Sequence, residues 1–268
     1  MHYGAKGATM RTFTLIVALL AVLCAGCVKL NLTLVIRETG AGTIQIGYSI
    51  AEQTVAQLEA MRRLEKNLRE TARADSPSPA QEDYTRLLFN PVKDEIVSLL
   101  KEYEKFGITT EKVEVRSRDM RREVEVRVRF ADLAKLAQTG LFRQYGFALR
   151  KDQKGNYVLS RPAQNPRPGG EPKPVDPETA KQLNPLLGGF SVTLTVHTPG
   201  PVLKATAPAS SPSSVTWSFE YDRDPNAILA IQDQDFAVVF DGQGLNLPEI
   251  SLAPQPDAKR DRTPGSDR

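Results

Sequence analysis

The chain has 268 residues, of which 40% are hydrophobic and 25% are charged, and its formal net charge is +3 at pH 7. This composition is sufficient for a globular core and excludes a protein that is disordered throughout. The 35 basic side chains are nearly balanced by 32 acidic ones, so we expect no general nucleic-acid binding.

Residues 1–26 have the pattern of an export signal. Lys6 and Arg11 are the only charged residues in this segment, and an uncharged, mostly apolar run extends from residue 12 to residue 27. That run is shorter than the roughly 20 apolar residues that a transmembrane helix requires. The sequence therefore predicts a signal peptide over residues 1–26 and an exported protein.

The apolar run ends in Leu23-Cys24-Ala25-Gly26-Cys27. This ending resembles the lipobox of bacterial lipoproteins, in which diacylglycerol is attached to a cysteine and a peptidase cuts before it. The resemblance implies cleavage between Gly26 and Cys27, acyl chains such as palmitate on Cys27, and anchoring to a bacterial membrane at the cell envelope. An ordinary secretory signal that happens to end in cysteine is the alternative.

Removal of residues 1–26 also limits the chemistry of the remaining chain. It takes away one of the two histidines and one of the two cysteines, which leaves His197 and the lipid-attachment residue Cys27. A zinc site of His and Cys ligands or a Cys-His catalytic pair then lacks its residues. We therefore expect no metal site and no cofactor.

The mature chain begins with a pattern typical of a β-hairpin. Apolar and polar residues alternate over 30–36 and over 43–50, and Gly40-Ala41-Gly42 lies between them. The first strand starts almost directly after Cys27, without the long tether that many lipoproteins have. We therefore expect the folded body to lie close to the membrane.

Helical periodicity dominates residues 51–107, which we interpret as a helical insertion. A first helix is predicted over 51–72, and a second begins with Asn90 as its cap and ends at Gly107. The apolar stripe of the second helix consists of Val92, Ile96, Leu99, Tyr103 and Phe106.

A charged hairpin is predicted over residues 112–130. Pairing Arg118 with Glu123 and Arg116 with Glu125 avoids most like-charge contacts between its strands, and this register leaves residues 119–122 as the loop. The charged face of the hairpin is either a ladder of solvated ion pairs or a phosphate-binding patch.

The remaining elements complete a predicted single α+β envelope domain over residues 27–250. Its fold is expected to be one curved antiparallel sheet of several hairpins packed against two main helices. The further elements are a short helix at 132–137, a hairpin of 147–149 with 157–159, a proline-rich loop at 162–177, strands at 190–197, 202–205, 215–221 and 236–240, and a disordered tail at 251–268.

Three aromatic side chains alternate with polar residues on one predicted strand. Trp217, Phe219 and Tyr221 therefore share one face of the sheet. They form either an apolar ligand-binding face or part of the core.

Several short motifs resemble the LppM-type bacterial envelope lipoproteins. These motifs are the lipobox cysteine, Gly40-Ala41-Gly42, His197-Thr198-Pro199-Gly200-Pro201-Val202 and Val215-Thr216-Trp217-Ser218-Phe219. The resemblance extends over most of residues 27–240. It implies an α+β envelope domain and, because a mycobacterial relative is associated with envelope glycolipids, an apolar or lipid-like ligand.

Three classes of function are compatible with these patterns. The first is a non-catalytic, membrane-anchored lipoprotein that binds an apolar or lipid-like ligand, and it is favoured. The second is an interaction or assembly lipoprotein that contacts another envelope protein. An enzyme is disfavoured because the common catalytic motifs are absent, so that a serine triad would depend on His197 and a carboxylate pair on residues such as Asp222 and Asp233.

Overall fold

The structure is a computed structural model that describes residues 28–56, 59–60, 63, 90–139, 142, 146–163 and 175–250. Several predictions fall on other residues and lie outside this range. They are the signal over 1–26, the lipid-attachment residue Cys27, most of the first helix, the centre of the proline-rich loop and the tail over 251–268.

The predicted first hairpin is confirmed. Strands β1 (Lys29–Ile36) and β2 (Gly42–Ala51) pair antiparallel along their whole length, from Lys29 opposite Ser49 to Ile36 opposite Gly42. The chain turns through Gly40, whose φ of 78° is in the left-handed region that favours glycine. β2 leads into helical residues 52–56.

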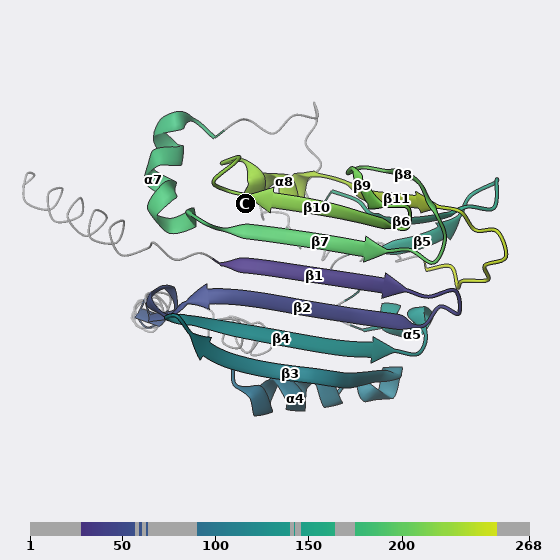
Figure 1. Cartoon of the computed structure of the whole chain (residues 1–268), viewed down its shortest axis with the longest axis horizontal. Coiled ribbons are helices and arrows are strands. Elements are labelled where there is room, and N and C mark those ends of the chain that lie inside the picture. The colour runs from purple at the N-terminus through teal and green to yellow at the C-terminus, as the bar shows by residue number, and fades with distance from the viewer. Residues whose placement is uncertain are drawn as a thin grey trace, which may run out of the picture.

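The larger of two sheets has seven strands in the order β3-β4-β2-β1-β7-β10-β9. Its other members are β3 (Ile108–Arg118), β4 (Arg121–Phe130), β7 (Ser191–His197), β9 (Ala209–Ser211) and β10 (Ser214–Glu220). β1 and β7 are parallel, so the prediction of an antiparallel sheet is wrong at this pair (Figure 1). Residues 37–190 separate these strands, and no local turn signals their pairing.

A second sheet has four strands in the order β5-β6-β11-β8. These strands are β5 (Ala148–Lys151), β6 (Tyr157–Arg161), β8 (Val202–Ala205) and β11 (Phe236–Phe240). The predicted hairpin of β5 with β6 is therefore confirmed. Both sheets join strands from before and after the proline-rich segment, but the expected single sheet is replaced by two.

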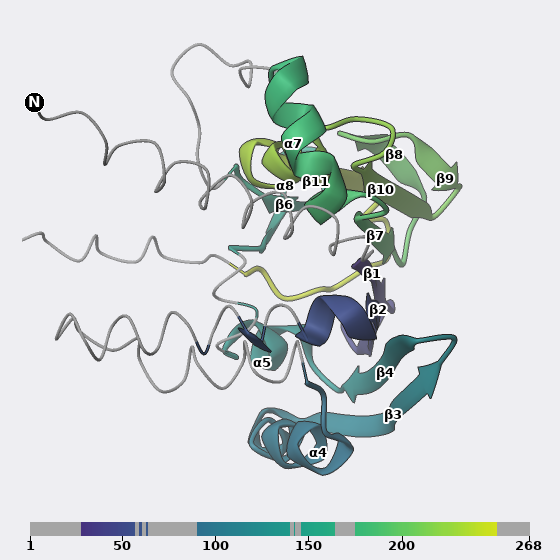
Figure 2. The same cartoon turned by 90° about the vertical axis from the view of Figure 1, so that its left-hand side faces the viewer.

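The helices and the small sheet lie on one side of the large sheet (Figure 2). The described helices are α4 (Lys93–Lys101), the 3-10 helix η1 (Glu104–Phe106), α5 (Leu133–Ala137), α7 (Pro177–Leu187) and α8 (Ala227–Asp233). The fold is α+β as predicted, but α7 and α8 are additional to the expected helices.

The beginning of α4 differs from the prediction. The helix starts at Lys93 after Val92 and has no side-chain cap, and the Asn90 side-chain oxygen accepts a hydrogen bond from the Arg122 guanidinium. Val92 was assigned to the buried stripe but is 40% exposed. The end differs as well, since α4 stops at Lys101, and Gly107, with a left-handed φ of 71°, instead ends the following 3-10 helix η1.

The predicted register of the β3–β4 hairpin is wrong. Arg116, not Arg118, lies opposite Glu123, and the strands are joined by the two-residue turn Asp119-Met120. Both turn residues have positive φ, 51° and 56°. A two-residue turn of this kind matches the twist of the paired strands, so turn geometry determines the register here.

Diagonal contacts compensate the like charges that this register places opposite each other. Glu114 faces Glu125, and the Lys112 ammonium lies 3.2 Å from the first carboxylate and 2.7 Å from the second. The hydrogen bond from Lys112 lowers the pKa of Glu125, and the same bond raises the pKa of Lys112. The charged face is thus a network of ion pairs, which the sequence analysis had considered beside a phosphate-binding patch.

The core lies mainly between the two sheets. The large sheet contributes Leu34, Val196 and Val215, and the small sheet contributes Leu159 and Val238. A smaller apolar cluster of Ile96, Val113 and Val124 packs α4 against β3 and β4. Helix α4 is therefore part of the folded body.

Candidate functional site

The predicted aromatic face consists of core residues in the structure. Trp217, Phe219 and Tyr221 are all buried. The Phe236 ring of the small sheet lies 5.5 Å from the Trp217 ring and 5.7 Å from the Phe219 ring, measured between centroids. These contacts join the two sheets.

The polar atoms of these aromatic residues have protein partners. The Trp217 indole N–H donates to the Thr206 hydroxyl at 3.1 Å, and the Tyr221 hydroxyl donates to the Ala180 carbonyl at 3.1 Å. Burial and the Asp222 carboxylate raise the pKa of Tyr221. The structure therefore shows no open apolar face at Trp217, Phe219 and Tyr221, and ligand contact at them stays a prediction.

The residues considered for catalysis belong to separate elements. His197 ends β7 on the polar face of the large sheet, opposite Ser214. Asp222 accepts the Gly189 N–H at 2.9 and 3.0 Å, and Asp233 ends α8. Within the described ranges, no three His, Cys, Asp or Glu residues are arranged to hold a metal ion.

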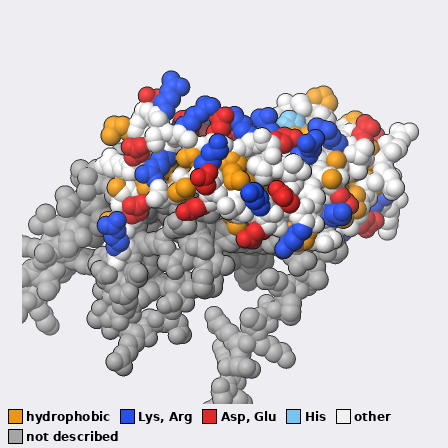
Figure 3. Space-filling model, turned by 90° about the horizontal axis from the view of Figure 1, so that it is seen from below, with side chains coloured by type: hydrophobic (Ala, Val, Ile, Leu, Met, Phe, Trp, Pro, Cys, Tyr) orange, Lys and Arg blue, Asp and Glu red, His pale blue; other side chains and the backbone are white. Residues whose placement is uncertain are grey.

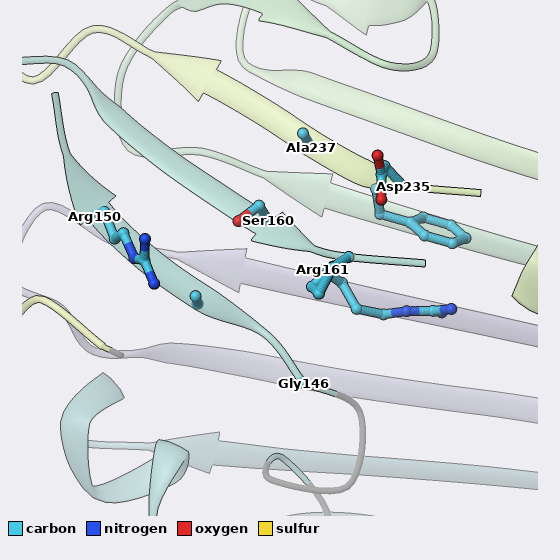
Figure 4. Close-up of a pocket in the computed structure, with 9 residues that line it drawn as sticks. Gly146, Arg150, Ser160, Arg161, Asp235 and Ala237 are labelled. Atoms are coloured by element: carbon cyan, nitrogen blue, oxygen red, sulfur yellow. The ribbon is translucent and has the colours of Figure 1, made fainter. Parts of the chain in front are cut away.

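A pocket of about 400 Å³ lies against the small sheet (Figure 4). Its floor consists of small side chains from three neighbouring strands. Ser160 of β6 pairs with Ala148 of β5 on one side and with Ala237 of β11 on the other, and Gly146 extends this floor beyond β5. The volume exists because none of these residues has a long side chain.

Charged residues lie at both ends of the floor, with Arg150 at one end and Asp235 at the other (Figure 4). The Asp235 carboxylate accepts the Ala163 N–H at 2.7 Å. The buried Arg161 donates to the Ile231 carbonyl at 2.8 Å, and its guanidinium lies 4.6 Å from the Phe236 ring centroid. Arg161 and Asp235 thus maintain the local structure, whereas Arg150 is exposed and suited to an anionic group.

The sequence patterns do not predict this pocket. Alternation along the two strands predicts that Phe147, Leu149, Tyr157 and Leu159 face the core. It follows that Ala148 and Ser160 point away from the core. Alternation does not show that β11 places Ala237 beside Ser160, because β11 and β6 are far apart in the sequence.

The face of the large sheet that points away from the small sheet and the helices is polar. It is the side turned toward the viewer in Figure 1. At its centre Thr33 lies beside Thr195, which lies beside Thr216. Seen from the side of β3 and α4, basic and acidic side chains are interspersed (Figure 3). The side of β3 and α4 therefore lacks the concentration of positive charge that phosphate binding favours.

Comparisons with known proteins give a limited result. No protein-family model matches the chain, and no curated protein matches it. The chain is similar to the folded domain of the LppM protein of Mycobacterium tuberculosis, solved by NMR, with a TM-score of 0.35 and 11% sequence identity over 82% of this chain and 94% of that chain. Likeness at this level assigns neither a family nor an activity.

The described part of the chain was also searched for membrane spans. None of its helices combines the length and the apolar character that crossing a bilayer requires.

Proposed function

We propose that the protein is a non-catalytic bacterial envelope lipoprotein, anchored through acyl chains on Cys27, whose body binds a lipid-like, anionic amphiphile. The pocket on the small sheet carries this proposal. Its volume of about 400 Å³ falls within the range of about 300–1,000 Å³ that is usual for small-molecule sites.

The chemistry of the lining matches such a ligand. Ala148, Ala237 and the Ser160 methylene offer apolar surface to a hydrocarbon, and the Arg150 guanidinium offers a positive charge to a carboxylate or phosphate headgroup. The proposal keeps the ligand class that the LppM-type resemblance suggested. It places the ligand against small residues of the second sheet rather than against Trp217.

The lipid anchor is supported by the lipobox and by the position of the first described strand. β1 starts at Lys29, two residues after Cys27. An acylated Cys27 would therefore hold the large sheet within a few residues of the membrane surface.

The intact mass of the protein tests the anchor. After expression of the full chain in a bacterium that processes lipoproteins, the membrane-extracted protein is expected to consist of residues 27–268 plus a diacylglyceryl group. Cys27→Ser should abolish this mass, and Cys24→Ser should preserve it. An unmodified mass in the wild-type protein, or a diacylglyceryl group that survives Cys27→Ser, would contradict the anchor.

Binding of the fluorescent fatty acid dansyl-undecanoate tests the pocket. Ser160→Leu places a larger side chain at the centre of the floor and is expected to weaken binding about tenfold. The side chain of residue 160 points out of the sheet, so we expect a stability change within about 0.5 kcal/mol. Arg150→Gln should weaken binding about fivefold because it removes the charge near the headgroup.

Val158→Leu is the matched control for Ser160→Leu. Val158 lies two residues earlier on the same face of β6 and does not line the pocket. Its replacement should leave the affinity unchanged within about twofold, which is about 0.4 kcal/mol. Equal affinities of the Ser160→Leu and Val158→Leu variants, or no binding by the wild-type protein, would contradict ligand binding in this pocket.

An interaction lipoprotein remains the second candidate. The observation that favours it is the broad polar face of the large sheet, which has the helices and the small sheet on its other side (Figures 1 and 2). Deleting residues 51–107 is a poor test of a partner surface, because Ile96 of α4 packs in the cluster with Val113 and Val124. A negative result for dansyl-undecanoate would make this candidate the better one.

A further inference from the structure

The tip of the β3–β4 hairpin carries a residue that the fold does not explain. Asp119 and Met120 both have positive φ, a backbone conformation in which Asn and Gly are the usual residues. Met120 is nevertheless 77% exposed, so its side chain adds little to the core. A single exposed apolar residue is ordinary, but one kept at a backbone conformation that favours glycine is a starting point for a hypothesis of function.

Arginines surround this methionine. Arg118, Arg121 and Arg122 lie within two residues of it, against the single acidic residue Asp119 in the same stretch. Arg121 is held by the fold, since its Nε donates to the Ser49 hydroxyl at 2.7 Å. The Arg118 side chain is 78% exposed, with its Nε 3.3 Å from the Asp119 carboxylate.

A second exposed apolar residue is close to the hairpin. The hydrogen bond between Arg122 and Asn90 brings the beginning of α4 to the tip, and Val92 follows Asn90 by two residues. Val92 is 40% exposed. We define the hairpin tip surface as Val92, Arg118, Met120 and Arg122.

The hairpin tip surface projects from the end of the large sheet at which β1 begins, on the left of Figure 1. Lys29 pairs with Ser49, and Ser49 pairs with Glu123, so these three residues lie at one level of the sheet. Met120 is three residues beyond that level, or about 10 Å of extended chain. Cys27 is two residues before Lys29 and is therefore within about 7 Å of it.

We propose that the hairpin tip surface is a second membrane contact, in which Met120 enters the interface of an anionic phospholipid bilayer and Arg118 binds its headgroups. This inference rests on the proposed lipid anchor, because the anchor places this end of the sheet at the membrane. Apolar insertion and arginine contacts to anionic lipid reinforce each other. Together with the acyl chains, they fix the orientation of the body on the bilayer.

The contact can be measured without the acyl anchor. A chain of residues 28–268 contains every described strand and helix, and its circular dichroism spectrum is recorded first to check that it is folded. Its cosedimentation is compared between vesicles of 30% phosphatidylglycerol in phosphatidylcholine and vesicles of phosphatidylcholine alone. We expect clear preference for the anionic vesicles and loss of binding when the salt concentration is raised.

Two substitutions separate the apolar part of the contact from the charged part. Met120→Gly suits the positive φ of the turn, so it should preserve the fold, and it should lower vesicle binding about fivefold by removing the inserted side chain. Arg118→Glu changes the local charge by two units and should lower binding about 20-fold.

Two exposed residues elsewhere serve as matched controls. Leu203 is 57% exposed in β8, and Arg37 is exposed just after the other end of β1. Leu203→Ser and Arg37→Glu should each change binding less than twofold, which is about 0.4 kcal/mol.

A reporter at the tip gives a direct readout of insertion. Cys24 and Cys27 are the only cysteines in the sequence, so Met120→Cys in the chain of residues 28–268 provides a single thiol for a nitrobenzoxadiazole label. We expect its emission to shift to the blue on anionic vesicles, whereas the same label introduced by Leu203→Cys should not respond.

Three results would overturn the proposal. They are absence of wild-type binding to the anionic vesicles, equal binding of the Arg118→Glu and Arg37→Glu proteins, and a label at position 120 that stays in water. If the hairpin tip surface instead binds a partner protein with an acidic surface, the label at position 120 is expected to stay in water on the vesicles. The experiment omits Cys27, so its failure leaves the mass test of the anchor unaffected.

Discussion

Phe236→Ala is expected to lower the free energy of unfolding by about 3–5 kcal/mol. The Phe236 ring is only 3% exposed and packs between the two sheets against Trp217 and Phe219. The Arg161 guanidinium lies over the same ring. Truncation would leave a cavity at the junction of the sheets and remove the contact that holds this buried cation in place.

Urea denaturation measures this effect, and Trp217 is a suitable probe because it is the single tryptophan and touches the Phe236 ring. Leu203→Ala, at an exposed position in β8, should change stability by no more than about 0.5 kcal/mol. A loss below about 1 kcal/mol for Phe236→Ala would show that this ring does not join the sheets.

Local patterns predicted the hairpins well. The β1–β2 and β5–β6 pairs follow from alternating apolar residues on either side of glycine-containing turns, and both turns use a glycine with positive φ, Gly40 and Gly155. The sequence contained no comparable signal for β1 beside β7, or for β11 between β6 and β8. Those neighbours are far apart in the chain, and their pairing depends on a buried face built from several elements rather than on a local turn.

The β3–β4 register shows how two local rules conflict. Counting opposite charges favoured Arg118 opposite Glu123, but each such pair contributes only about 0.2–1 kcal/mol. The twist-matched turn at Asp119-Met120 prevailed, and Lys112 satisfied both glutamates diagonally. Long flexible side chains adapt to a register more easily than a two-residue turn does.

The candidate site was misplaced for a different reason. Sequence analysis draws attention to large aromatic residues such as Trp217, and these residues are the ones that a core most readily buries. A pocket on the surface of a sheet requires short side chains at neighbouring positions of adjacent strands. Ala148, Ser160 and Ala237 meet that requirement, but only the pairing of three strands reveals it.

Gly42→Ala is expected to destabilise the protein by about 3 kcal/mol. A Cβ atom at this position would lie 1.9 Å from the Val35 carbonyl oxygen and 2.5 Å from Cζ of Phe130. The first contact is with backbone, so β1 and β2 would have to separate at the start of their hairpin. The second is with a fully buried ring that cannot move without disturbing the core. The glycine thus follows from the sterics of the hairpin, and its place in the Gly40-Ala41-Gly42 motif is weak evidence of family membership.

Gly47→Ala on the same strand is the matched control. A Cβ atom there would meet no heavy atom within 4 Å, so the substitution should be neutral or should stabilise by up to about 1 kcal/mol, by restricting the unfolded chain. Both variants can be followed by urea denaturation with Trp217 fluorescence. Equal stabilities of the two variants would show that β1 and β2 do not approach each other at Gly42 as closely as the structure has them. A large difference in stability between the Gly42→Ala and Gly47→Ala variants is expected because only Gly42 lies against a neighbouring backbone. The alternation of apolar and polar residues along the strand does not distinguish these two glycines.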